Sequence, residues 1–101
     1  MNTGVVSMRY AKALLAYAEG QKVEDRVYEE VKTLAANYVN VPDLRRAIEN
    51  PVLDAKRKCE LLREASGGKD VSEELMRFFA LVLDERREKF LQFMLWSYID
   101  V

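Results

Sequence analysis

The chain has 101 residues and a mass of 11.7 kDa, close to the commonest size of a single domain. Half of the residues are hydrophobic and a third are charged, with only four glycines and two prolines, which excludes a disordered chain, a collagen and a β-sandwich. Sixteen basic and seventeen acidic side chains leave a net charge of −1, so no overall positive charge attracts the chain to nucleic acid or anionic lipid.

The sequence lacks the residues that most enzyme and metal sites use. It contains no histidine, and its single cysteine, Cys59, cannot form a disulfide within the chain. No serine has a histidine to activate it, and no glycine-rich phosphate loop is present. We therefore expect no enzymatic activity, no metal and no cofactor, and we expect Cys59 to be buried.

Neither a targeting segment nor a membrane span is expected. Charged residues interrupt the apolar stretch of residues 1–20, which is atypical of a signal peptide. The longest nearly uncharged run, residues 90–99, is about half as long as a membrane-spanning helix requires. These features predict a soluble, cytoplasmic chain.

Apolar residues recur at helical spacing along the chain, and no stretch alternates with period two for long enough to predict a strand. The first four predicted helices cover residues 4–19, 23–39, a short segment from Pro42 to Asn50, and residues 54–65. Gly20, Pro51 and Ser66-Gly67-Gly68 are the predicted stops after the first, third and fourth helices. Glu29, Glu30 and the run Lys56-Arg57-Lys58 are expected on solvated helix faces.

The C-terminal third of the chain allows two interpretations. Asp70 and Glu73 resemble a capping box at the start of a fifth helix. Residues 71–99 could form one long helix by spacing alone, or two helices separated at the charged stretch 84–88. Residues 90–99 are apolar on nearly all sides, which predicts an exposed apolar end near Trp96 and Tyr98. The predicted fold class is an all-α bundle of five or six helices with short connections.

Two predicted helices carry more apolar surface than packing on one side requires. In the first helix, one stripe joins Val6, Tyr10, Ala13 and Tyr17, and an adjoining stripe includes Leu14. In the fifth helix, Phe78 flanks the core stripe and Leu81 stands among polar positions. Both helices are either central in the bundle or form a groove for another chain.

Four short motifs, in order along the whole chain, resemble one family. The run Arg9-Tyr10-Ala11-Lys12-Ala13-Leu14 resembles the start of the delta subunit of rotary ATP synthase, the counterpart of the mitochondrial oligomycin sensitivity-conferring protein. Asn50-Pro51-Val52-Leu53 and the Lys-containing helix after it resemble a second family motif, and Phe78-Phe79 with Val82 a third. Glu85-Arg86-Arg87 resembles the corner beyond the fifth helix, although the family usually has Asn or Gly there.

The resemblance implies a non-catalytic stator subunit of a proton- or sodium-driven ATP synthase. It implies that residues 1–101 are the six-helix N-terminal domain of a longer subunit, with a break near Arg86. This subunit would bind the N-terminal helix of an alpha subunit between its first and fifth helices and would thereby resist rotor torque. The implied groove residues are Val6, Tyr10, Ala13, Tyr17, Phe78 and Leu81.

The remaining expectations concern other partners and location. The resemblance implies that the absent C-terminal part meets the stalk b subunit, and that the complex lies at the cytoplasmic side of the cell membrane. No nucleic acid is expected to bind, because no helix has a basic face. No direct membrane insertion is expected, because no apolar run is long enough to cross a bilayer. The alternative is an all-helical domain for protein interaction or regulation, without a role in ATP synthase.

Overall fold

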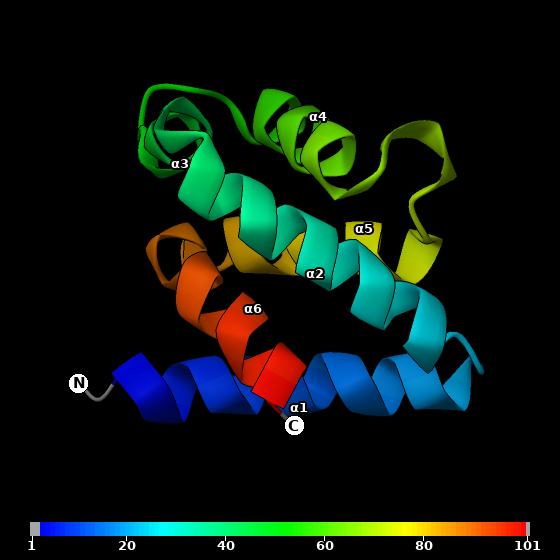
Figure 1. The fold of residues 1–101 in the computed structure, drawn as a ribbon. Helices are drawn as coiled ribbons and strands as arrows, with labels where there is room; N and C mark the ends of the chain where they lie inside the picture. The colour runs from blue at the N-terminus through cyan, green and yellow to red at the C-terminus, as the bar shows by residue number, and fades with distance from the viewer. Residues whose placement is uncertain (1–2, 101) are drawn as a thin grey trace.

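Six α-helices and two short 3₁₀-helices make up the fold of residues 3–100, which are the residues that the computed structural model describes (Figure 1). The elements are α1 (Thr3–Gly20), α2 (Glu24–Asn40), α3 (Pro42–Glu49), α4 (Ala55–Ser66), η1 (Gly68–Asp70), α5 (Glu73–Asp84), η2 (Glu88–Phe90) and α6 (Leu91–Asp100). No strand occurs within the described residues, so the predicted all-α, six-helix class is confirmed.

Two sharp corners are made by charged residues with positive φ. After α1, Lys22 has φ 60°, while Gly20, the predicted stop, is still helical. After α5, Arg86 has φ 56°, and the N–H of Arg87 donates to the carbonyl of Val82 at 2.9 Å. This hydrogen bond is typical of a Schellman helix end. The corner decides between the two interpretations of residues 71–99: two helices separated near Arg86.

The start of α5 differs from the predicted capping box. Asp70 lies in η1, and Ser72 is the N-cap, whose hydroxyl accepts a hydrogen bond from the N–H of Leu75 at 3.3 Å. Glu30 of α2 accepts hydrogen bonds from the N–H of Ser72 at 2.8 Å and from its hydroxyl at 2.6 Å. Serine is preferred at this position because its side chain satisfies an N–H of the first helical turn.

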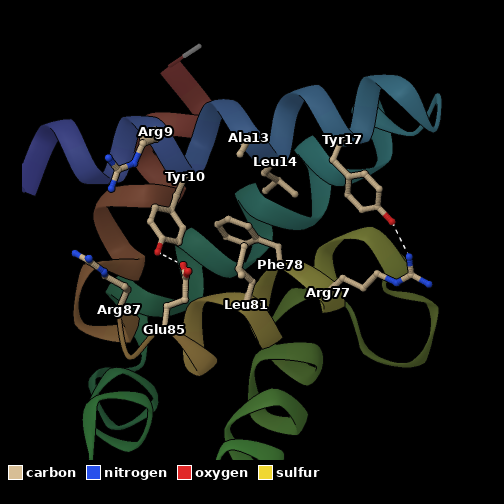
Figure 2. A pocket seen from close by; sticks show the side chains of 10 residues that line it. All are labelled: Arg9, Tyr10, Ala13, Leu14, Tyr17, Arg77, Phe78, Leu81, Glu85 and Arg87. Carbon is tan, nitrogen blue, oxygen red and sulfur yellow. Dashed lines mark hydrogen bonds between the residues drawn. The ribbon is translucent and has the colours of Figure 1, made fainter.

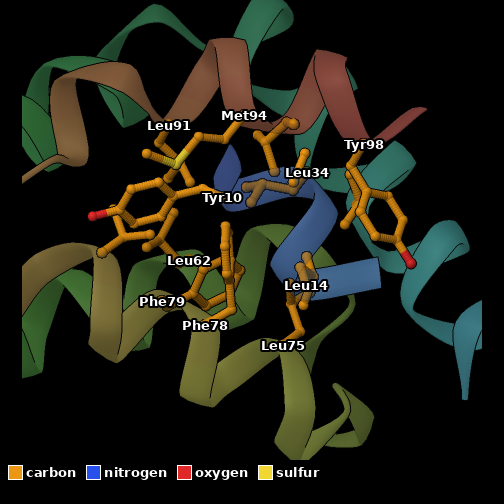
Figure 3. Packing of buried hydrophobic residues seen from close by; sticks show 14 of the residues in the cluster. Tyr10, Leu14, Leu34, Leu62, Leu75, Phe78, Phe79, Leu91, Met94 and Tyr98 are labelled. Atoms are coloured by element: carbon orange, nitrogen blue, oxygen red, sulfur yellow. The ribbon is translucent and has the colours of Figure 1, made fainter. Parts of the chain in front are cut away.

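The core lies where α6 packs between α1 and α2, with α4 and α5 completing its other side (Figures 1 and 3). Its largest fully buried apolar side chains come from α2 to α6 and include Leu34, Ile48, Leu62, Leu75, Phe79, Leu91, Met94 and Leu95. Leu14 of α1 joins them at 3% exposure, as its predicted stripe requires. None of the described helices is long and apolar enough to span a membrane.

Four burial predictions were wrong. Glu30 and Lys58 are buried, at 9% and 4% exposure, because each has a charged or polar partner from a distant part of the chain. Cys59 is only half-buried, at the edge of the core. Tyr98 is buried, whereas Trp96 is exposed as expected and packs edge-on against exposed Phe93 at 5.9 Å between ring centres.

Candidate functional site

A groove of about 580 Å³ runs between α1 and α5 (Figure 2). We call it the α1–α5 groove; its lining residues are Arg9, Tyr10, Ala13, Leu14 and Tyr17 of α1 with Arg77, Phe78, Leu81, Glu85 and Arg87 of α5 and the corner after it. A volume of this size is within the range of pockets that hold ligands or side chains of a partner. The groove is the candidate functional site.

Hydrogen bonds between side chains bridge α1 and α5 at both ends of the groove. The hydroxyl of Tyr10 donates to the carboxylate of Glu85 at one end. At the other end, Arg77 donates to the hydroxyl of Tyr17 at 2.9 Å (Figure 2). Because the residue later in α1 pairs with the residue earlier in α5, the two helices run antiparallel along the groove.

The floor between the two bridges is apolar. Phe78 is 7% exposed and Leu14 is 3% exposed, so both belong to the core and present only an edge to the groove. Above them, Ala13 is exposed and Leu81 is 46% exposed. Figure 2 shows Ala13 facing Phe78 and Leu81 across the space between the helices. Since Ala13 ends at a methyl group, the backbone of α1 is open to close approach along this stretch.

Charged groups surround the hydroxyl of Tyr10. Burial raises the pKa of Tyr10, and the hydrogen bond to Glu85 raises it further. The positive charges of Arg87 and Arg9 act in the opposite direction and lower this pKa. Tyr10 therefore remains a neutral hydrogen-bond donor at physiological pH, with its ring on the apolar floor and its hydroxyl at the rim.

Five of the six residues predicted for the groove line it, namely Tyr10, Ala13, Tyr17, Phe78 and Leu81. Val6 does not: it is 5% exposed and packs in the core one turn before Tyr10. Leu14, assigned to the adjoining stripe, contributes to the floor as well as to the core. Helical spacing placed these residues on two helices with excess apolar surface, and the family resemblance joined them as the lining of one groove.

The charged residues of the rim were not predicted as site residues. Arg9, Arg77, Glu85 and Arg87 all line the groove. Sequence spacing could have predicted two of them. Arg77 and Glu85 lie four residues before and after Leu81, which places them on the same face as this groove residue. Arg9 likewise precedes Ala13 by one turn of α1. Within residues 3–100, no group of three or more His, Cys, Asp or Glu side chains is arranged to hold a metal ion.

Comparison with known proteins gives consistent matches. Residues 6–101 match the family described as ATP synthase delta (OSCP) subunit. The chain is 61% identical over its full length to the ATP synthase subunit delta of Phocaeicola vulgatus, of which it covers 55%. It is 45% identical to that of Bacteroides fragilis, again over the full chain and 55% of the relative. The similarity extends to Microcystis aeruginosa, at 33% identity over 91% of this chain and 50% of the relative.

The chain thus spans about half the length of the curated relatives that it matches. No solved structure is significantly similar to it.

Proposed function

Because the chain belongs to the ATP synthase delta (OSCP) subunit family, we propose that its α1–α5 groove binds the N-terminal helix of an alpha subunit of the catalytic head. The contacts would come from Tyr10, Ala13, Tyr17, Phe78 and Leu81, while Val6 fixes α1 from the core side. Such binding is the helix-in-groove mode, in which apolar side chains at helical spacing enter a hydrophobic groove.

The observation that carries this proposal is the exposed apolar strip formed by Ala13 and Leu81 over a floor of buried aromatic and aliphatic side chains. A partner helix that covers this strip removes apolar surface from water without exposing any of the core. The two tyrosine bridges hold α1 and α5 at a fixed separation, so the groove exists before the partner arrives. Preorganisation of this kind lowers the entropic cost of binding.

The proposed role is mechanical and non-catalytic. The chain would be the N-terminal domain of a longer subunit, consistent with relatives that are nearly twice as long. In the complete subunit, the C-terminal part would bind the stalk b subunit. The subunit would then join the head to the peripheral stalk on the cytoplasmic side of the membrane, so that rotor torque drives synthesis instead of rotating the head.

The alternative, a helical interaction domain unrelated to ATP synthase, makes a different prediction for the same groove. A peptide titration distinguishes the proposed function from this alternative. The 101-residue chain is titrated with a synthetic peptide that copies about the first 20 residues of the cognate alpha subunit. This length allows about three helical turns of contact and a flank at each end. We expect saturable binding with one peptide per chain by isothermal titration calorimetry. The proposed function would be contradicted if the peptide does not bind, or if substitutions of groove residues leave its affinity unchanged.

A further inference from the structure

The rim of the α1–α5 groove is positively charged although the chain as a whole carries a net charge of −1. Three arginines line the groove, at positions 9, 77 and 87, and Glu85 is the one acidic residue among the lining residues. The lining residues therefore carry an excess of two positive charges, and Glu73, which pairs with Arg77 at 2.6 Å, lies just outside them.

The arginines lie at the two ends of the groove. Arg9 and Arg87 lie at the end marked by Tyr10, where the charges of both lower the pKa of its hydroxyl. Arg77 lies at the other end, where it contacts Tyr17 (Figure 2). Tyr10 and Tyr17 are separated along α1 by about two helical turns, or about 10 Å. The apolar floor lies between these two positive ends.

Glu85 does not remove the positive character of its end. Its carboxylate accepts a hydrogen bond from the neutral hydroxyl of Tyr10, which leaves its negative charge in place. Glu85 therefore offsets one of the two arginine charges at this end, and an excess of one positive charge remains. Arg77 is held differently: it donates to Tyr17 at 2.9 Å and to Glu73, one turn earlier in α5, at 2.6 Å. Both side chains of the Arg77–Glu73 pair are more than half exposed, and exposed pairs of this kind are weak. A carboxylate from a partner can therefore take the place of Glu73.

From this charge pattern we infer that the α1–α5 groove selects an amphipathic helix whose apolar face is flanked by carboxylates at both ends, roughly two turns apart. The inference rests on the proposed function and adds the charge pattern that the docked helix must carry. Its carboxylates face Arg9 at one end and Arg77 at the other, while its apolar side chains cover Ala13 and Leu81.

Charges at the rim of an interface act mainly on the rate of association and on its salt dependence. At low ionic strength the positive ends attract an acidic helix over roughly 10–30 Å, and at high salt this attraction is screened. They also suppress wrong partners, because a helix with basic flanks would bring like charges together. The groove therefore discriminates between helices that have the same apolar face.

Three synthetic peptides test the inference with the 101-residue chain. They share one apolar face and differ only at the flanking positions, which are Glu, Gln or Lys. We expect the Glu peptide to bind about tenfold more tightly than the Gln peptide at low salt, and the Lys peptide to bind most weakly. The difference between the Glu and Gln peptides should shrink as the salt concentration rises.

Variants of the chain assign the effect to the groove. Arg9→Gln and Arg77→Gln should each reduce the ratio of the affinities for the Glu and Gln peptides. Arg77→Gln also removes the bridge to Tyr17, so it should weaken binding of both peptides, and the ratio of the two affinities is the quantity compared. Arg63→Gln is the matched control, because Arg63 is an exposed arginine of α4 outside the groove. Circular dichroism melts of the three variants check that each remains folded.

Equal affinity for the Glu and Gln peptides overturns the inference, as does a preference that survives both groove substitutions. So does a lack of binding by all three peptides. In each of these cases, binding of the alpha-subunit peptide to the same groove would leave the proposed function standing. Conversely, a chain that prefers the Glu peptide through Arg9 and Arg77 but ignores the alpha-subunit peptide supports the charge selection and contradicts the proposed partner.

Discussion

The buried carboxylate of Glu30 on α2 accepts two hydrogen bonds from Ser72, the residue that caps α5. One comes from the N–H of Ser72 at 2.8 Å and the other from its hydroxyl at 2.6 Å. Arg26, one turn earlier in α2, lies 3.5 Å from the same carboxylate. Because α5 supplies Phe78 and Leu81 to the groove, this contact fixes the start of the helix that forms one groove wall.

Glu30→Ala should therefore lower the free energy of unfolding by about 2–3 kcal/mol, because a buried N–H loses a charged acceptor. Its neighbour provides the control: Glu29 is exposed, and Glu29→Ala should change stability by less than about 0.5 kcal/mol. Urea denaturation followed by circular dichroism measures both. If the two substitutions cost the same, the Glu30–Ser72 contact does not stabilise the fold.

A second polar contact joins α4 to the corner between α5 and α6. The ammonium group of Lys58 lies 3.4 Å from the carboxylate of Glu88, and the exposed fractions of the two side chains are 5% and 20%. Glu88→Gln leaves the ammonium group buried without its counter-charge, so we expect a loss of about 2 kcal/mol. Lys58→Met, which keeps an aliphatic side chain and removes the charge, should cost less.

Lys56 serves as the control for this pair, since it is an exposed lysine of the same helix. Lys56→Met should leave the urea midpoint within error of the parent chain. A Glu88→Gln variant as stable as the parent would show that the Lys58–Glu88 pair contributes nothing net to stability.

Spacing along the sequence was enough to predict the helices and which faces are apolar, because both follow from residues three and four positions apart. Ala13 and Leu14 illustrate this: adjacent in sequence, they point to solvent and to the core, although Val6 and Tyr10 of the Ala13 stripe are buried. The pairing of the first and fifth helices as a groove came from the family resemblance.

Glu30 and Lys58 were wrongly assigned to solvated faces. Their partners, Ser72 and Glu88, lie far away along the chain, so the local sequence does not show that these charged side chains can be buried with a partner.

Helix ends were less predictable than helix faces. At both corners the left-handed residue is charged, Lys22 and Arg86, where local preference would favour glycine or asparagine. The N–H of Val23 donates to the carbonyl of Ala18 at 2.9 Å, so the first corner is a Schellman end like the second. Gly20 stands only two residues before Lys22, so the strongest local signal was slightly misplaced. The residue that adopts the left-handed conformation depends on how the following helix packs. This packing cannot be predicted from the local sequence.

Stability should fall at alkaline pH because of buried tyrosines. Burial, followed by the negative charges of Glu19, Glu24 and Asp25, raises the pKa of Tyr98 to about 12. In the unfolded chain this hydroxyl loses its proton at about pH 10. Stability from Tyr98 is thus fully present below about pH 10 and is lost as the pH rises towards 12, because the unfolded state then binds fewer protons than the folded state.

Tyr98→Phe tests this dependence. The hydroxyl of Tyr98 is buried without a hydrogen-bond partner among the described residues, so its removal should change stability little at neutral pH. The variant should lose less stability than the parent between about pH 9 and about pH 11. Burial also raises the pKa of Tyr38 far above its usual range, so Tyr98→Phe reduces the alkaline loss without abolishing it. Parallel urea titrations of parent and variant with identical pH dependence would contradict this account.

Ala13→Asp separates a role in binding from a role in folding. Ala13 is exposed in the free chain, so the new carboxylate stays hydrated and the melting transition should remain cooperative. A docked helix would cover position 13 and desolvate an unpaired charge, which costs several kcal/mol and should weaken binding of the alpha-subunit peptide by at least about 100-fold.

Leu14→Asp is the matched control, since Leu14 is 3% exposed and its substitution places a carboxylate in the core. The cost of burying this charge is comparable to the whole stability of a small domain, so the variant should not fold. Circular dichroism melts and calorimetric titration of both variants give the comparison. If Ala13→Asp melts like Leu14→Asp, position 13 supports the fold; if it binds the peptide like the parent, the partner helix does not lie against this stretch of α1.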